Sequence, residues 1–152
     1  IREVIAARIK ELAAELIRDY ADKKPVFLPV MTGAYMFAAD LMRAIRPPIK
    51  GMWVESIKAK SYFGTESCGT VKVNDINFDL KDRHVVLVED IVDTGLTLET
   101  LKGRVMATGA ASCTIVTLLN KKARRTNGMQ PEYAGFDCEV RPHNKRTPPP
   151  PS

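Results

Sequence analysis

The sequence predicts an α/β protein built on a central, mainly parallel sheet that is flanked by helices. Residues 85–88 are apolar and mostly β-branched, which is typical of a strand buried on both faces of a parallel sheet. Two acids, Glu89 and Asp90, follow at the carboxyl end of this strand. Short apolar strands alternate with amphipathic helical patterns, and Gly33 and Gly95 mark strand-to-helix turns. Together these observations favour one α/β domain.

The elements before the central strand follow from helical and strand periodicity. Ile5, Ile9 and Leu12 recur at helical spacing with charged residues on the other faces, which predicts a surface helix packed on the sheet. The next helix is ended by Pro47, which cannot continue it. The expected order is a helix at 1–20, a strand at 26–31, a tight turn at 32–34, a helix at 35–45 and one strand at 49–60.

The second half of the chain begins with a polar segment. Residues 61–70 are polar with glycines near both ends, and alternation resumes at 71–73, so the residues alone fit a long hairpin connection. After the central strand we expect a helix that runs to about Thr108 and is ended by Gly109. Residues 112–119 are rich in Val, Ile and Thr and predict another buried strand.

Composition restricts the class of protein. The chain has 152 residues, of which 45% are hydrophobic and 27% charged, as expected of one globular domain. No apolar run is long enough to span a membrane, and the first residues lack a signal-peptide pattern, so we expect a cytoplasmic protein with no membrane partner. Three cysteines without metal-like spacing predict reduced thiols. A net charge of +5 suits anionic partners, which include nucleic acid and small polyphosphates.

The residues after the central strand predict a phosphate site. In Asp93-Thr94-Gly95-Leu96-Thr97, the glycine permits unusual backbone angles, the two threonines offer hydroxyl donors, and an amphipathic helix begins. Backbone amides at the start of a helix bind anions. The turn at Thr32 and Gly33 repeats this logic, although turns of this kind are more often purely structural.

The sequence Val-Glu-Asp-Ile-Val-Asp-Thr-Gly-x-Thr at residues 88–97 resembles the phosphoribosyl-pyrophosphate (PRPP) motif of type I phosphoribosyltransferases. Within that superfamily it looks most like the hypoxanthine-guanine phosphoribosyltransferases. The resemblance implies the type I phosphoribosyltransferase fold with a lid hairpin. It also implies purine salvage, in which the 5-phosphoribosyl group of PRPP passes to hypoxanthine or guanine to give IMP or GMP and pyrophosphate.

The resemblance also implies roles for segments outside this motif. Residues 29–41 are similar to the family's pyrophosphate-binding loop with its helix, which gives Thr32 and Gly33 that role. Many family members have lysine or arginine at the position of Thr32, so pyrophosphate contact here would depend on backbone amides. Ser61 and Tyr62 match the family's lid, which closes over the substrates and excludes water.

Catalytic and binding roles follow from the same resemblance. Asp93 is the implied general base, Lys121 the donor to the exocyclic oxygen of the purine, and Arg125 a family arginine near the phosphate-loop side of the site. The implied metal is Mg²⁺, held by Glu89 and Asp90, which also hold the ribose hydroxyls. The implied PRPP-binding residues are Glu89, Asp90, Ile91, Val92, Asp93, Thr94, Gly95, Leu96 and Thr97.

Two alternatives remain open. A non-enzymatic regulator on the same fold would sense PRPP and bind RNA through the basic residues at 121–125, although no aromatic side chains lie between them. A receiver-like signalling domain would use Glu89 and Asp90 as an acidic magnesium pocket. The receiver-like domain does not require the Asp-Thr-Gly-x-Thr sequence, so nucleic acid and receiver function are less favoured than PRPP transfer.

The resemblance covers residues 1–137, which we interpret as an incomplete phosphoribosyltransferase domain. Residues 138–152 form a divergent tail that we expect to be disordered. The family has four functional groups in that region: an aromatic residue that stacks on the purine, a backbone carbonyl that reads the edge of the purine, an aspartate that binds magnesium and an arginine that binds pyrophosphate. We find no residue here that can take these roles. We therefore expect a chain that is truncated or aberrant at its C-terminus, with severely reduced activity. Family members usually form dimers or tetramers, and we expect a homo-oligomer.

Overall fold

The computed structural model describes residues 1–62 and 70–139. Within these two stretches, every helix is too short or too polar to pass through a lipid bilayer. The elements, in chain order, are α1 (Arg2–Tyr20), β1 (Val26–Met31), α2 (Tyr35–Ala44), β2 (Trp53–Val54), β3 (Ile57–Tyr62), β4 (Thr70–Val73), β5 (His84–Val92), α3 (Leu96–Ala107), β6 (Ser112–Lys121) and β7 (Tyr133–Cys138).

One sheet runs through the molecule in the order β4-β3-β1-β5-β6-β7, with β2 pairing beside the first residues of β1. All strand pairs are parallel except β3 with β4, which form an antiparallel hairpin. The mainly parallel sheet and the hairpin predicted from the sequence are therefore confirmed. The central place of β5 is confirmed as well, because β1 and β6 flank it.

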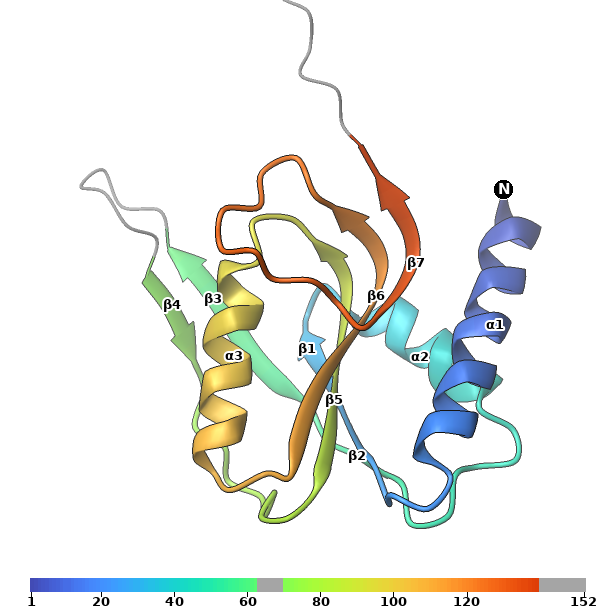
Figure 1. The fold of residues 1–152 in the computed structure, drawn as a ribbon, viewed down its shortest axis with the longest axis horizontal. Coiled ribbons are helices and arrows are strands. Elements are labelled where there is room, and N and C mark those ends of the chain that lie inside the picture. Colours follow the sequence, from blue (N-terminus) through green and yellow to red (C-terminus); the bar gives the residue numbers. More distant parts are fainter. Residues whose placement is uncertain (63–69, 140–152) are drawn as a thin grey trace, which may run out of the picture.

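Helices cover both faces of the sheet, with α1 and α2 on one face and α3 on the other (Figure 1). Alternate residues of β5 serve the two cores, as expected of a strand buried on both faces. Val86 and Val88 pack with α1 and α2, whereas Val85 and Leu87 pack with α3. The apolar run that predicted a parallel strand is therefore used on both sides.

The single strand expected at 49–60 is wrong, because the structure has two short strands, β2 and β3, in this region. The carbonyl oxygens of Pro25 and Phe27 accept hydrogen bonds from Trp53 and Glu55. The next residue of β1 whose backbone faces the β2–β3 segment is Pro29, which has no N–H to donate. Pairing therefore stops beside Pro29 and resumes where Val30 lies opposite Ile57.

Two other strands extend further than the sequence predicted. Glu89 and Asp90 lie within β5 rather than after it, because β5 stays paired with β6 through Val92 opposite Asn120. Lys121 is the last residue of β6 and pairs with Cys138 of β7. Neighbouring strands thus override the weak strand preference of charged residues.

Candidate active site

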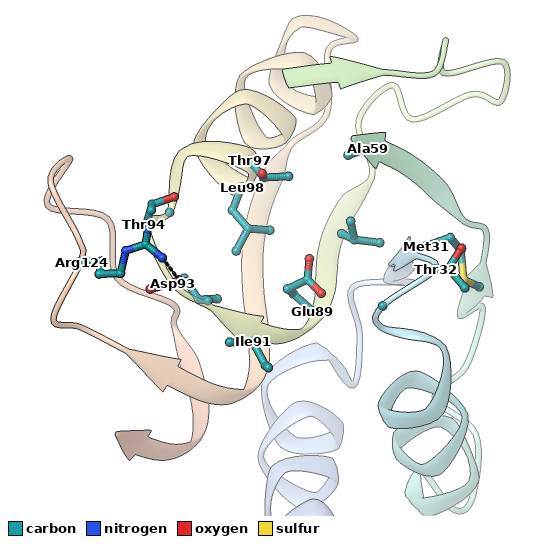
Figure 2. Close-up of a pocket in the computed structure, with 14 residues that line it drawn as sticks. Met31, Thr32, Ala59, Glu89, Ile91, Asp93, Thr94, Thr97, Leu98 and Arg124 are labelled. Atoms are coloured by element: carbon teal, nitrogen blue, oxygen red, sulfur yellow. Dashed lines mark hydrogen bonds and ion pairs between the residues drawn. The ribbon is translucent and has the colours of Figure 1, made fainter. Parts of the chain in front are cut away.

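A cavity of about 420 Å³ opens at the carboxyl ends of β1 and β5. Ligands of open α/β sheets bind at this edge. Figure 2 shows Met31 and Thr32 on one side of the cavity, Thr94 and Arg124 on the other, and Glu89 between them. The lining residues are Val30, Met31, Thr32, Gly33, Ala59, Glu89, Ile91, Val92, Asp93, Thr94, Gly95, Thr97, Leu98 and Arg124.

The two acids of β5 face the turn after β1. A Cβ placed on Gly33 would lie 3.6 Å from Asp90 Oδ1 and 3.9 Å from Glu89 Oε1, so the absence of a side chain there leaves space beside both carboxyl groups. The Asp90 N–H donates to Glu89 Oε1 at 3.0 Å, and the Thr117 hydroxyl donates to the Asp90 carbonyl oxygen at 3.2 Å. The structure thus brings the two acids and the Thr32–Gly33 turn together.

Burial raises the pKa of the Glu89 carboxyl from 4.5 to about 8. Desolvation is the largest cause, and the neighbouring Asp90 carboxyl adds to it. A carboxyl group held in this way is uncharged at neutral pH. A bound cation would favour its ionised form.

The segment 93–97, here called the 93–97 loop, turns the chain from β5 into α3. Gly95 has φ +83°, a left-handed conformation that glycine adopts without strain. A Cβ at this position would also lie 3.0 Å from Asn127 Oδ1 and 3.2 Å from Arg125 Cδ. Helix α3 begins at Leu96, and the first N–H groups of any helix lack acceptors within it. The 93–97 loop therefore presents donors and the positive end of a helix dipole to the cavity.

Asp93, the predicted general base, is ion-paired. Arg124 Nη1 lies 3.0 Å from Asp93 Oδ2, and both side chains line the cavity (Figure 2). The sequence reasoning missed Arg124, which it treated only as a member of a basic run. The signal was the Arg124-Arg125 doublet shortly after a strand that ends beside the site.

Arg125 has a different environment from its neighbour. Its guanidinium group donates hydrogen bonds to the backbone oxygens of Asp93, Val92, Met129 and Lys121 and to the side chain of Asn120, at 2.8–3.1 Å. Arg125 therefore lies beside the 93–97 loop. Its contacts are with the protein chain, and it is outside the cavity lining.

Some of the other predicted residues also lie outside the cavity lining. Leu96 is 39% exposed, and neither Asp90 nor Lys121 lines the cavity. Val92, the last residue of β5, lies opposite Asn120, and Lys121 follows Asn120 in β6 as Asp93 follows Val92 in the chain. Ser61 and Tyr62 end strand β3, and the remaining lid residues, 63–69, lie outside the described part of the chain.

The cavity combines groups suited to a ligand with hydroxyls and a phosphate. Carboxyl oxygens accept hydrogen bonds from sugar hydroxyls or bind hard cations, and the amides and threonine hydroxyls of the 93–97 loop donate to anionic oxygens. In the described residues, no group of three or more His, Cys, Asp or Glu side chains is placed to hold a metal by itself. A metal at Glu89 and Asp90 would therefore need further ligands from a substrate.

Comparison with known proteins gives consistent results. A family model described as "Phosphoribosyl transferase domain" matches residues 2–151. A hypoxanthine-guanine-xanthine phosphoribosyltransferase of Tritrichomonas foetus is 37% identical over 139 residues, which are 90% of this chain and 74% of that protein.

Solved structures of the same kind superpose well. A hypoxanthine-guanine phosphoribosyltransferase from Bacillus anthracis has a TM-score of 0.80 and 34% identity, covering 91% of this chain and 79% of that one. A Trypanosoma cruzi hypoxanthine phosphoribosyltransferase, solved in work on how its C-terminal region affects oligomeric state and activity, has a TM-score of 0.78 and 31% identity, covering 91% and 75%.

Proposed function

Because the chain belongs to the phosphoribosyltransferase family, we propose that the cavity at the ends of β1 and β5 is where it transfers a 5-phosphoribosyl group from PRPP to a purine. The protein is a hypoxanthine-guanine phosphoribosyltransferase that acts in purine salvage. Its products are IMP or GMP, with pyrophosphate as the leaving group. The names of the relatives favour this transferase over the non-enzymatic RNA-binding alternative.

One observation supports the location of the reaction most directly. A single cavity is lined by the Thr32–Gly33 turn, by Glu89 and by the 93–97 loop. PRPP carries a pyrophosphate, two ribose hydroxyls and a 5′-phosphate. The three parts of the cavity have the chemistry to bind these three groups in the same order.

Glu89 and Asp90 bind the ribose hydroxyls, and the 93–97 loop binds the 5′-phosphate through its amides and hydroxyls. As C1 of the sugar gains positive charge during transfer, the carboxylates beneath the ring stabilise it electrostatically. Thr32 and Gly33 bind the departing pyrophosphate through backbone N–H groups, since neither residue is a cation. These interactions with the positive sugar and the departing pyrophosphate are stronger in the transition state than in the bound substrate, so they lower the barrier to transfer.

Asp93 takes the proton from the purine ring nitrogen that attacks C1. Its place at the start of the 93–97 loop and on the cavity wall supports this role. Lys121, which follows the partner of Val92 on β6, donates a hydrogen bond to the exocyclic oxygen of the purine. Adenine has an amino group at that position, so the site would leave the lysine unpaired and reject adenine.

Mg²⁺ fits the carboxyl pair of β5. Mg²⁺ is usually bound by one or two carboxylates together with substrate phosphates and water, which agrees with two acids beside a side-chain-free Gly33. When bound, the ion supplies charge neutralisation at the pyrophosphate. Because burial raises the pKa of Glu89 to about 8, Glu89 would release its proton on binding the ion.

Two further proposals extend this function. The lid that begins at Ser61 and Tyr62 closes over bound substrates and excludes water. The chain works as a homo-oligomer in the cytoplasm, and a link between the C-terminal region and assembly is the subject of work on the Trypanosoma cruzi relative.

The direct test is to incubate the chain with PRPP, Mg²⁺ and hypoxanthine or guanine and to quantify IMP or GMP by chromatography. Product should appear, should require Mg²⁺, and should not form from adenine. Asp93→Asn provides the matched inactive control. Absence of product together with absence of PRPP binding would contradict the proposal, and salt-dependent RNA binding without transfer would favour the regulator.

A further inference from the structure

The 93–97 loop contains no basic side chain, although its proposed ligand is a phosphate dianion. Its residues are Asp93, Thr94, Gly95, Leu96 and Thr97, so its one ionisable side chain is an acid. Among the described residues that line the cavity, Arg124 is the one cation. Arg124 therefore provides the positive charge that the loop lacks.

The chain immediately after Arg124 is fixed to the 93–97 loop and to the residues that flank this loop. Arg125 donates to the Asp93 carbonyl oxygen at 3.1 Å and to the Val92 carbonyl oxygen at 3.0 Å. Asn127 donates to Glu99 on α3 at 2.9 Å and lies against Gly95. Because these anchors hold the backbone of residue 124 beside the loop, the Arg124 side chain reaches the cavity from a fixed position.

The guanidinium group of Arg124 has donors to spare. In the described part of the chain, its one hydrogen bond is the contact with Asp93 Oδ2, and its side chain is 67% exposed. Exposed ion pairs of this kind are weak. Arginine binds phosphate through two parallel N–H groups. Two such hydrogen bonds to a dianion are stronger than one hydrogen bond to a carboxylate. Arg125, in contrast, uses all its nitrogens on the protein.

From this arrangement we infer that Arg124 is a phosphate-binding residue. It pairs with Asp93 in the structure and exchanges the Asp93 carboxylate for the 5′-phosphate when a ligand binds. This exchange leaves the Asp93 carboxylate open to the purine. The inference rests on the proposed function, because it names a contact to the substrate of that same site.

The test compares two ligands that differ only in the phosphate, IMP and inosine, by isothermal titration calorimetry. Arg124→Gln should weaken IMP binding about tenfold, as loss of one charge-assisted contact implies, and should leave inosine binding unchanged. Arg124→Lys should retain part of the IMP affinity as a point charge. Arg104→Gln, in the last turn of α3, is the matched control and should change neither affinity.

The possible results separate a failure of this inference from a failure of the proposed function. Unchanged IMP binding by Arg124→Gln, or an equal loss for IMP and inosine, would overturn the inference and leave the proposed function intact. Failure of the wild-type chain to bind IMP and to form it from PRPP would overturn the proposed function, and this inference with it. Circular dichroism of each variant verifies that the exposed substitution has not disturbed folding.

Discussion

Arg125 Nε donates a hydrogen bond to the backbone oxygen of Asp93 at 3.1 Å, so a residue after β6 fixes the first residue of the 93–97 loop. The same guanidinium group also contacts the side chain of the buried Asn120. Asn120 in turn donates to Asp137 Oδ1 at 2.9 Å. One half-buried arginine thus joins β5, β6 and the loop that follows β6.

Arg125→Met should lower the free energy of unfolding by about 3 kcal/mol, because it leaves several polar groups without their partner. It should also weaken PRPP binding, since the 93–97 loop loses its support. Urea denaturation and PRPP titration measure the two effects. Arg43→Met removes an exposed arginine paired with Asp40 and should change stability by less than about 1 kcal/mol. Equal effects of the two variants would contradict the structural role of Arg125.

Asp93→Asn should reduce turnover at least about 100-fold, which is the lower range for loss of a general base. PRPP affinity should change little, because the amide keeps the shape of the side chain and the backbone of the 93–97 loop stays in place. Single-turnover kinetics and PRPP titration separate these effects. If Asp93→Asn kept full turnover, the proton-transfer role would be wrong.

Lys121→Ala should weaken hypoxanthine and guanine binding about 10- to 100-fold, the usual effect of losing a hydrogen bond from a charged donor. PRPP binding should stay close to that of the wild type. Lys122→Ala is the control, because the Lys122 ammonium group makes an exposed contact of 3.5 Å with Asp137. An equal loss of PRPP binding in Lys121→Ala would instead indicate a phosphate contact.

The sequence was sufficient to predict elements whose ends are marked by proline or glycine. Strand β1 spans Val26–Met31 as expected, between Pro25 and the turn at Gly33. Strand ends set by a neighbouring strand were missed, because the pairing that carries β5 through Glu89 and Asp90 depends on β6. The split between β2 and β3 was missed for the same reason, since its cause is Pro29 in another strand.

The site was predictable to the extent that its residues are adjacent in sequence. Glu89 and the 93–97 loop share one segment, and Gly33 marks the other side of the cavity. The partner of Asp93 was not predictable, because a basic run does not indicate which arginine faces the cavity and which is held by backbone oxygens. That difference between Arg124 and Arg125 depends on how the loop after β6 packs on Gly95.

The raised pKa of Glu89 predicts that stability depends on pH. This pKa is about 8 in the folded protein and near 4.5 in the unfolded protein. The stability that the Glu89 carboxyl contributes is therefore fully present below pH 4.5 and is lost as the pH rises toward 8. The free energy of unfolding should fall by up to about 1.4 kcal/mol per pH unit in this range. Urea midpoints at pH 5 and pH 8 measure it.

Glu89→Gln should show a smaller change in urea midpoint between these two pH values than the wild type, because the amide does not titrate. Glu3→Gln alters an exposed acid at the start of α1 and should keep the pH dependence of the wild type. The explanation fails if wild type and Glu89→Gln respond to pH in the same way.

Gly95→Ala should destabilise the protein by about 1–3 kcal/mol, since alanine is strained at φ +83° and its Cβ would press on Asn127. PRPP binding should weaken more than purine binding. Gly103→Ala is the matched control within the next element, where a Cβ meets nothing within 4 Å. Alanine in a helix interior should stabilise by about 0.5–1 kcal/mol, so the two variants should shift the melting temperature in opposite directions.

Because β5 continues through Val92, this strand sets the distance between the two ends of the ligand site. A strand advances about 3.3 Å per residue, so the backbone at Glu89 and at Asp93 is separated by about 13 Å of stiff chain. Pairing with β6 at Glu89, Ile91 and Val92 keeps the strand part of this span from stretching or shortening. In some sugar phosphates the phosphate lies one carbon nearer to the hydroxyls, or one carbon further away. Such a ligand should therefore reach either Glu89 or the 93–97 loop, but not both at the same time.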